Sequence, residues 1–154
     1  LKSSREHYGE DSTVANCLNN IGLVYAAKRN FEEALKYLQE SLEVKKRLYG
    51  EDDAEIAQSY TNIAGMQNAL NKLEDAIQNY EKALEIYRKV LGNDHFYIGN
   101  ISSNLGVVYS KLGNNQTALK YLEEARDNYK KSIGEENHYY SAVMRAIEET
   151  KSKS

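Results

Sequence analysis

The chain has 154 residues, no proline, a formal net charge of -3 and one cysteine. This acidic balance argues against a nucleic-acid surface, which needs a basic stripe to displace counterions from phosphates, and against a polybasic contact with a membrane. No apolar run is long enough for membrane insertion, and Cys17 has no partner for an intrachain disulfide, so we expect a reducing, cytoplasmic environment.

Glycines predict where the helices end. Residues 1–8 have the pattern of the last turns of a helix, which we expect to stop at Gly9, because glycine takes the left-handed C-cap conformation at little cost. The same stop recurs at Gly50, Gly92 and Gly134, and each glycine is followed by acidic or amide residues that suit a helix start. Since the chain begins without a methionine inside such a helix, we expect it to be a piece of a longer protein.

Between these stops, apolar residues recur at spacings of three and four, which indicates amphipathic helices. Breaks at Asn30, at 71–72 and at 113–115 separate the helices into pairs. The final helix becomes polar toward its end, as a terminal cap does. The helical stripes cover residues 13–28, 31–48, 56–66, 73–87, 98–109, 118–129 and 139–151.

The sequence repeats itself every 42 residues. Asn-Ile-Gly-Leu-Val-Tyr at 20–25 returns as Asn-Leu-Gly-Val-Val-Tyr at 104–109, and a more divergent copy begins at Asn62. Stacked repeats build an elongated core from contacts between neighbours, so we predict an all-α fold of antiparallel helix pairs. The predicted divisions are the end of a preceding repeat helix with its loop (1–12), three repeats (13–54, 55–96 and 97–138) and a C-terminal capping helix (139–154).

Small and aromatic residues recur at fixed positions of the helix pairs. They are Gly22, Ala64 and Gly106, then Ala34, Ala76 and Ala118, then Ser41, Ala83 and Ala125, with the aromatics Tyr25 and Tyr109. In these positions the pairs resemble tetratricopeptide repeats, whose usual period is about 34 residues. The longer period, with Leu-Asn-Asn-Ile-Gly at 18–22, Glu-Glu-Ala at 32–34 and Leu-Gly-Asn-Asp-His at 91–95, is similar to the repeats of kinesin light chains. The resemblance implies a right-handed superhelical solenoid with a concave groove.

Three residues depart from the tetratricopeptide pattern. Gln67 stands where an aromatic is expected, Asn115 replaces the aromatic that opens the second helix, and Phe96 occupies a position that is normally proline. We expect the second and third repeats to pack less tightly at these points.

One position of the first helix carries asparagine in every repeat, at Asn20, Asn62 and Asn104. An amide side chain offers an acceptor and two donors, which match the C=O and N–H groups of an extended peptide. The resemblance implies that these asparagines grip the main chain of a peptide, as the equivalent residue commonly does in similar repeat proteins. One such contact contributes only about 0.5–1.5 kcal/mol, so a ladder of them is needed. The alternative is that the amides bond within the scaffold and hold the helix pairs in register.

Positions that flank this asparagine ladder are expected to line the same groove, and they are neutral and rich in amides. Tetratricopeptide domains that clamp a carboxylate or acidic cargo use several basic residues, whereas Lys111 stands alone here. At Gly65, between Leu23 and Val107, we hypothesise a shallow apolar pocket for one ligand side chain; the alternative is a glycine tolerated in a helix at a cost of about 1 kcal/mol. The predicted lining residues are Asn16, Asn19, Leu23, Gln58, Thr61, Gly65, Asn68, Asn100, Ser103, Val107 and Lys111.

The residues needed for chemistry are missing from the sequence. His7, His95 and His138 are far apart and lack neighbouring ligands, and Cys17 has no histidine partner, so it is expected to be a small packing residue. We therefore predict no enzymatic activity, no metal site and no cofactor.

Two functions remain. The first is a protein interaction scaffold that binds a peptide or helical segment of a partner in the concave groove. The alternative is a structural spacer or self-association module of a larger protein, because repeat ends expose apolar surface. In both cases the expected partner is a protein or peptide, with no nucleic acid.

Overall fold

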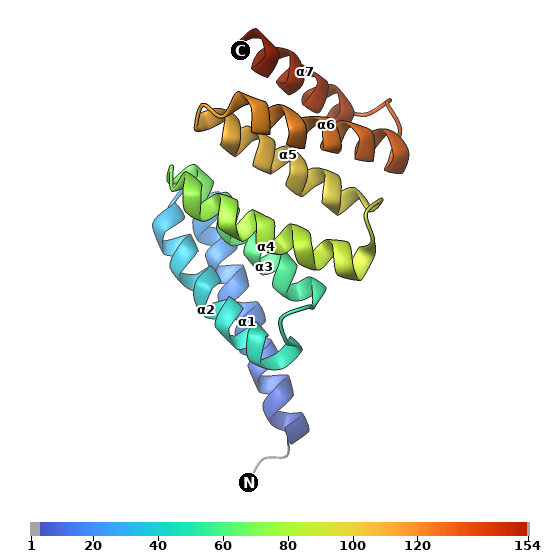
Figure 1. Ribbon diagram of the computed structural model, residues 1–154. Coiled ribbons are helices and arrows are strands. Elements are labelled where there is room, and N and C mark those ends of the chain that lie inside the picture. Colours follow the sequence, from blue (N-terminus) through green and yellow to red (C-terminus); the bar gives the residue numbers. More distant parts are fainter. Residues whose placement is uncertain (1–3, 154) are drawn as a thin grey trace. The chain divides into compact units, whose positions relative to one another are not determined.

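The computed structural model describes the backbone of residues 4–153 and the side chains of residues 11–153. Over this range the chain forms helices and no strand, which confirms the all-α prediction (Figure 1). The helices are too short or too polar, over the same residues, to cross a membrane. They are α1 (Ser4–Ala27), α2 (Phe31–Tyr49), α3 (Ala54–Ala69), α4 (Leu73–Leu91), α5 (Phe96–Lys111), α6 (Asn115–Ser132) and α7 (His138–Ser152).

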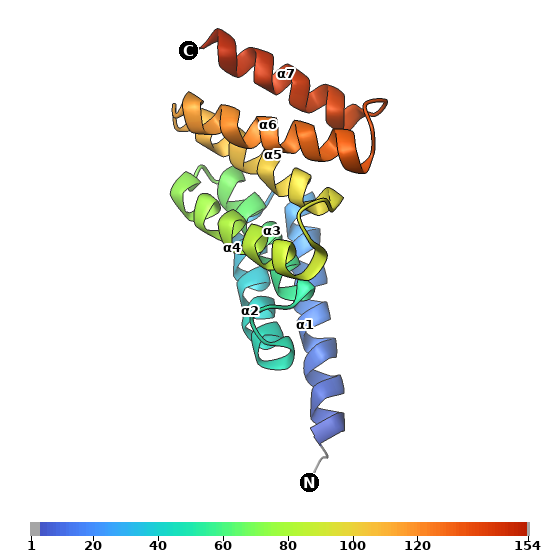
Figure 2. The same ribbon diagram turned by 45° about the vertical axis from the view of Figure 1, so that its right-hand side comes forward.

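The chain divides into two compact units, 1–79 and 80–154, with the boundary inside α4. In the first unit α1 packs on α2 and α2 on α3. In the second unit α5 packs on α6 and α6 on α7, which gives successive antiparallel layers (Figure 2).

The predicted starts and ends of most helices are confirmed. Gly50, Gly92 and Gly134 have φ angles of 78°, 82° and 82°, in the left-handed region that glycine enters at little cost. Asn30 accepts a hydrogen bond from the backbone N–H of Glu33, in the geometry of a helix N-cap. Asp53, Asn114 and Asn137 cap α3, α6 and α7 in the same way. The cap of α5 is His95, whose Nδ1 accepts from the Tyr97 N–H at 3.1 Å, rather than the preceding Asn93 or Asp94.

The helix end predicted at Gly9 is wrong, because α1 runs without interruption from Ser4 to Ala27. A glycine inside a helix costs only about 1 kcal/mol relative to alanine. Gly9 therefore permits a stop without enforcing one, and the acidic residues that follow it lie within α1 instead of starting it.

The small residues of the repeat allow the two helices of a pair to approach closely. A Cβ at Gly22 would lie 2.9 Å from Leu38 Cγ, and a Cβ at Gly106 would lie 2.6 Å from Leu122 Cγ. Leu38 and Leu122 are each 1% exposed, so neither side chain has room to move away.

The aromatic positions of the first and third repeats form stacked pairs that join the two helices of each repeat. The rings of Tyr25 and Tyr37 have centroids 5.5 Å apart and lie 8° from parallel. The equivalent Tyr109 and Tyr121 rings are 5.6 Å apart at 6°.

The second repeat replaces this ring pair with a pair of amides. Asn79 Nδ2 donates to Gln67 Oε1 at 2.7 Å, and Gln67 is buried. The looser packing expected at Gln67 is therefore wrong, because the lost ring contact is replaced by a hydrogen bond between the same two positions.

Phe96 also packs more tightly than its departure from the pattern suggests. Its ring meets the Tyr139 ring edge-on at 4.9 Å and the Tyr129 ring at 5.7 Å. Phe96 borders the core cluster in which α6 and α7 meet through Leu122, Ala125, Tyr129, Val143 and Ile147.

Candidate functional site

The predicted groove residues of the first unit lie on one side of α1 and of α3. Asn16, Asn20 and Leu23 are exposed on α1, Leu23 by 42%, and Asn19 beside them is half-buried. Their spacing of three and four places them on the same helix face.

On α3, Gln58 is exposed, whereas Thr61, Asn62, Gly65 and Asn68 are half-buried. The hydroxyl of Thr61 donates to the Ala57 carbonyl at 2.9 Å, so its proton is used within the helix. The apolar pocket hypothesised at Gly65 stays a prediction, since Leu23 and Val107, the residues expected to flank it, belong to different units.

In the second unit, α5 carries the corresponding face. Asn104, Val107 and Lys111 are exposed, and Asn100 and Ser103 are half-buried.

Asn100 is held by a bond from α6. Its Oδ1 accepts a hydrogen bond from the Tyr129 hydroxyl at 2.7 Å. Burial raises the pKa of Tyr129 to about 12, so the hydroxyl stays protonated and remains a donor at neutral pH. Because this bond uses the Asn100 carbonyl, the N–H groups of its amide stay available.

The side chains of the three equivalent asparagines make no hydrogen bond to any residue in the described part of the chain. Asn20 and Asn104 are exposed, and Asn62 is half-buried. The alternative in which these amides hold helix pairs in register needs bonds that are not found among residues 11–153. Asn20 and Asn62 belong to the first unit and Asn104 to the second, so the continuous ladder stays a prediction.

A cavity of about 200 Å³ adjoins the groove face of the second unit. Two predicted groove residues, Val107 and Lys111, line it, and α7 supplies the opposite wall. This wall consists of Ala146, Glu149 and Thr150 of α7 and of Lys153, its C-cap, none of which is among the predicted groove residues. Lys111 is therefore not the only basic residue on this face.

The repeat period could have identified the α7 residues. Ala146 lies 42 positions after Asn104, and Lys153 lies 42 positions after Lys111. The polar pattern of α7 predicts a terminal cap, but its residues occupy the positions of a first repeat helix. At the asparagine position α7 carries alanine, so the series of asparagines ends at Asn104.

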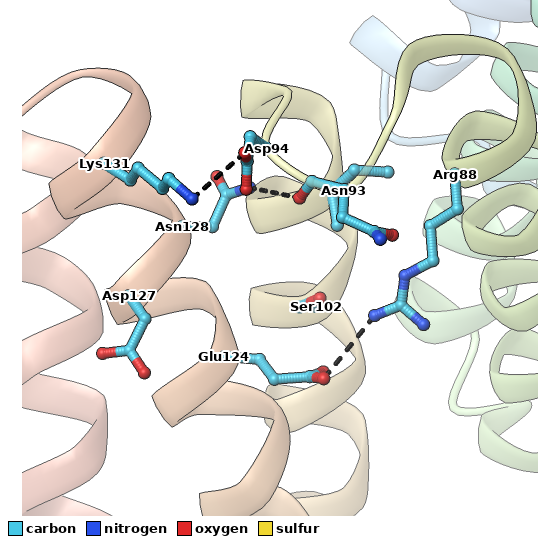
Figure 3. A pocket seen from close by; sticks show the side chains of 9 residues that line it. Arg88, Asn93, Asp94, Ser102, Glu124, Asp127, Asn128 and Lys131 are labelled. Carbon is cyan, nitrogen blue, oxygen red and sulfur yellow. Dashed lines mark hydrogen bonds and ion pairs between the residues drawn. The ribbon is translucent and has the colours of Figure 1, made fainter.

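A larger cavity, of about 490 Å³, lies elsewhere in the second unit and contains none of the predicted groove residues. Four of its lining residues form two ion pairs: Arg88 with Glu124 at 3.6 Å, and Lys131 with Asp94 at 3.1 Å (Figure 3). Ile98 and Ser102 of α5 contribute to its lining.

Asn128 fixes one wall of the larger cavity. Its Nδ2 donates to the carbonyls of His95, at 2.9 Å, and Asn93, at 3.3 Å, which ties α6 to the loop before α5. A side chain at Gly99 would collide with the Asn128 amide, so the glycine makes this bridge possible.

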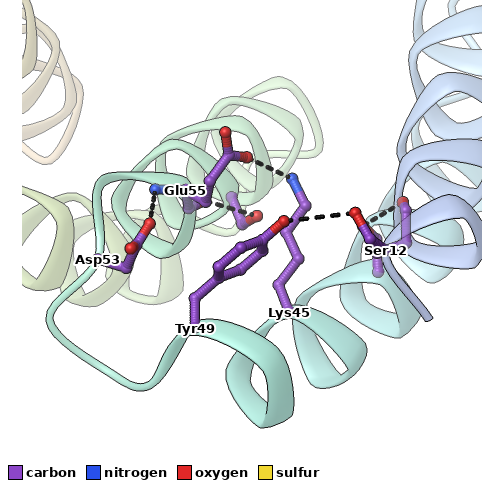
Figure 4. A network of polar contacts seen from close by, with 8 residues as sticks. Ser12, Lys45, Tyr49, Asp53 and Glu55 are labelled. Carbon is purple, nitrogen blue, oxygen red and sulfur yellow. Dashed lines mark hydrogen bonds and ion pairs between the residues drawn. The ribbon is translucent and has the colours of Figure 1, made fainter. Parts of the chain in front are cut away.

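A polar network in the first unit has a structural role. Lys45 is 4% exposed, and its Nζ pairs with Glu55 Oε2 at 3.3 Å (Figure 4). Nearby, the Tyr49 hydroxyl lies 3.5 Å from Ser12 Oγ, and Asp53 caps the Glu55 N–H. A buried lysine must be paired, so these contacts fix the junction between α2 and α3.

Three matches to a family model described as "Tetratricopeptide repeat" cover residues 13–89, 55–131 and 97–152 and begin 42 residues apart. None of the curated proteins matches the sequence.

Solved structures share the fold at low sequence identity. A Podosopora anserina protein named as a kinesin light chain, with nearly identical TPR-like repeats, is 17% identical, with a TM-score of 0.81 over 93% of this chain and 67% of its own. BtubC (BKLC) from P. vanneervenii is 18% identical, with a TM-score of 0.76 over 90% of this chain. The N-terminal domain of stress-induced protein-1 from C. elegans is 16% identical, with a TM-score of 0.67 over 88% of this chain and 96% of that domain. The chain spans 59% of the length of BtubC.

Proposed function

We propose, since this chain belongs to the tetratricopeptide repeat family, that it is a protein interaction scaffold that binds an extended or helical segment of a partner protein on the groove faces of α1, α3 and α5. The repeats are of the 42-residue type similar to those of kinesin light chains. The partner segment is neutral over most of its length, because the groove lining carries amides and hydroxyls rather than several basic residues.

The observation that carries this proposal is the set of asparagine side chains at one position of three successive first helices. Asn20, Asn62 and Asn104 have no bond to the described scaffold, so their donors and acceptors are available to a ligand. At about 0.5–1.5 kcal/mol each, three such contacts contribute about 1.5–4.5 kcal/mol, which is enough to change the affinity by one to three orders of magnitude.

The cavity between α5 and α7 would hold one side chain at the end of the bound segment. Val107 and Leu122 supply apolar walls, and Lys111 and Lys153 outweigh the charge of Glu149. A side chain with an apolar stem and an acidic tip fits this combination.

The proposal is tested by capturing partners with the wild-type chain and with the triple variant Asn20→Ala, Asn62→Ala, Asn104→Ala. A matched control carries Gln39→Ala, Gln78→Ala and Gln116→Ala, which removes three exposed amides from the second helices of the pairs. We expect the asparagine variant to lose the proteins that the wild type and the control both retain. Equal capture by all three chains would contradict a role for the asparagines.

A second function is supported by the exposed apolar residues of α1. Val14, Ile21 and Val24 are 48%, 41% and 54% exposed, at spacings that place them on one side of the helix. Such a face is suited to packing against a further repeat or another copy of the chain, as a structural spacer or self-association module does. Sedimentation over a range of concentrations would then show an oligomer that Val14→Lys with Ile21→Lys dissociates, without loss of the captured partner.

A further inference from the structure

The larger cavity of the second unit has an unsatisfied polar group in its lining. Ser102 is 1% exposed, and its Oγ has no hydrogen-bond partner in the part of the chain that the structure describes. Buried hydroxyls are normally paired, so an unpaired one beside a cavity indicates a place for a polar group from outside. Figure 3 shows Ser102 on α5 between the Arg88 and Glu124 side chains and the loop of Asn93 and Asp94.

The repeat period explains why the cavity exists. The residue 42 positions before Ser102 is Tyr60, and the residue 84 positions before it is Leu18. The first two repeats therefore place a large side chain where the third places a serine. Truncating a large side chain in a packed protein leaves a cavity when the neighbours do not collapse into the space.

The cation that contacts the Tyr60 ring has an equivalent beside the cavity. Lys46 Nζ of α2, in the first repeat, lies 5.6 Å from the centroid of the Tyr60 ring of α3, in the second repeat, which is a cation–π contact between neighbouring repeats. The residue 42 positions after Lys46 is Arg88, which lines the cavity and pairs with Glu124 there. Between the second and third repeats the cation is thus kept, at Arg88, and the aromatic ring is lost, at Ser102.

We propose that this cavity binds the side chain of a tyrosine from a partner protein. A volume of about 490 Å³ accepts a phenol ring, and Ile98 offers it an apolar contact. The Tyr60 side chain is attached to its own helix, so its hydroxyl is the end farthest from that backbone. A tyrosine side chain from a partner enters from solvent, so its hydroxyl is the end that reaches deepest into the cavity. Its hydroxyl then reaches the wall at Ser102, and its face lies within reach of the Arg88 guanidinium.

The charge of the lining selects the neutral phenol over its phosphate ester. Three carboxylates, from Asp94, Glu124 and Asp127, face two basic residues, Arg88 and Lys131. A phosphate near three carboxylates is repelled, so phosphorylation of the bound tyrosine would release it.

The test uses blocked tyrosine, N-acetyl-tyrosinamide, titrated into the full chain while the backbone amide resonances are followed by NMR. We expect saturable shifts at Ile98, Ser102 and Asn128. N-acetyl-phenylalaninamide should bind about 3- to 10-fold more weakly, since it lacks the hydroxyl for Ser102, and the phosphotyrosine derivative more weakly still. No saturable shift at these residues, or equal binding of the phenylalanine and tyrosine probes, would overturn the proposal.

Variants locate the site. Ser102→Tyr restores the residue found at the equivalent Tyr60, so it should fill the cavity from within and abolish the shifts while the fold is kept. Ser102→Leu, which copies Leu18, provides a second test if the tyrosine variant does not fold. The matched control Ser141→Tyr adds a tyrosine at an exposed position of α7 and should leave the titration unchanged. Binding that survives in both folded Ser102 variants would place the site elsewhere.

The phenol that the cavity binds could belong to a tyrosine of a protein or to a small aromatic molecule. The two are distinguished by comparing the binding of 4-methylphenol with that of a blocked Gly-Tyr-Gly peptide. Binding of the peptide at least as tightly as the free phenol supports a protein partner. Exclusion of the peptide would overturn that assignment in favour of a small aromatic molecule. Dimerisation of the wild type that Ser102→Tyr abolishes would mean that the tyrosine comes from a second copy of this chain.

Discussion

At Gly22 and Gly106 the absence of a side chain decides how closely two helices pack. The period of 42 residues made these positions predictable, because a small residue recurs there in each repeat. Single residues whose role depends on a neighbour far along the chain were harder to predict. Ser102 could have been found only by comparison with Leu18 and Tyr60 at the same position, and the small side chain alone carries no such signal.

Gly106→Ala should destabilise the second unit by about 1 kcal/mol. The added Cβ would lie 2.6 Å from Leu122 Cγ, and over-packing of this kind costs about 1–3 kcal/mol, against a gain of about 1 kcal/mol from helix propensity. The matched variant Gly22→Ala should cost less, because its closest contact is 2.9 Å. Urea denaturation measures both, and a Gly106→Ala variant more stable than the wild type would show that the helices are free to separate.

Tyr129 should make stability fall at high pH. Burial raises its pKa to about 12, from an unfolded value near 10.0, so the folded state keeps a proton that the unfolded state loses. The stability contributed by the buried neutral phenol is complete below about pH 10 and is lost as the pH rises toward 12. Thermal melts between these pH values should show a smaller decline for Tyr129→Phe than for the wild type, and an equal decline would rule out this residue as a cause.

At the scale of elements, the helices and their caps followed from local signals, but the contacts between helices did so only in part. The sequence identified Gln67 as a departure from the pattern, yet it gave no indication that Asn79 would pair with it. Side chains 12 residues apart on two antiparallel helices meet only once the pair has folded. The same limit applies to α7, where the polar pattern hid residues that form a cavity wall with α5.

The amide pair of Gln67 and Asn79 should be replaceable by two tyrosines only when both residues are changed together. Gln67→Tyr and Asn79→Tyr each place a ring against an amide and should destabilise the chain. Together they recreate the stack seen at Tyr25 with Tyr37, which is worth about 0.5–1.5 kcal/mol beyond burial. A double-mutant cycle measures this coupling, and strictly additive effects would mean that the two positions do not contact each other.

At the scale of the whole molecule, the all-α fold was predictable because a repeat needs only its neighbours for a core. The course of α1 through Gly9 was not, since a glycine permits either a stop or a continuation. The division into two units within α4 has no sequence signal such as a proline or a loop. The predicted groove residues lie on α1 and α3 in the first unit and on α5 in the second, so a ladder that joins them is a prediction about the whole molecule.

The most direct test measures the affinity of the captured partner segment for the triple asparagine variant, by calorimetry, together with the melting temperature of that variant. We predict a loss of affinity of about 10- to 1000-fold, with an unchanged or higher melting temperature. The melting temperature should not fall, because these amides make no bond to the described scaffold and alanine is the better helix former. Unchanged affinity with a lower melting temperature would contradict the account and assign the asparagines to the scaffold.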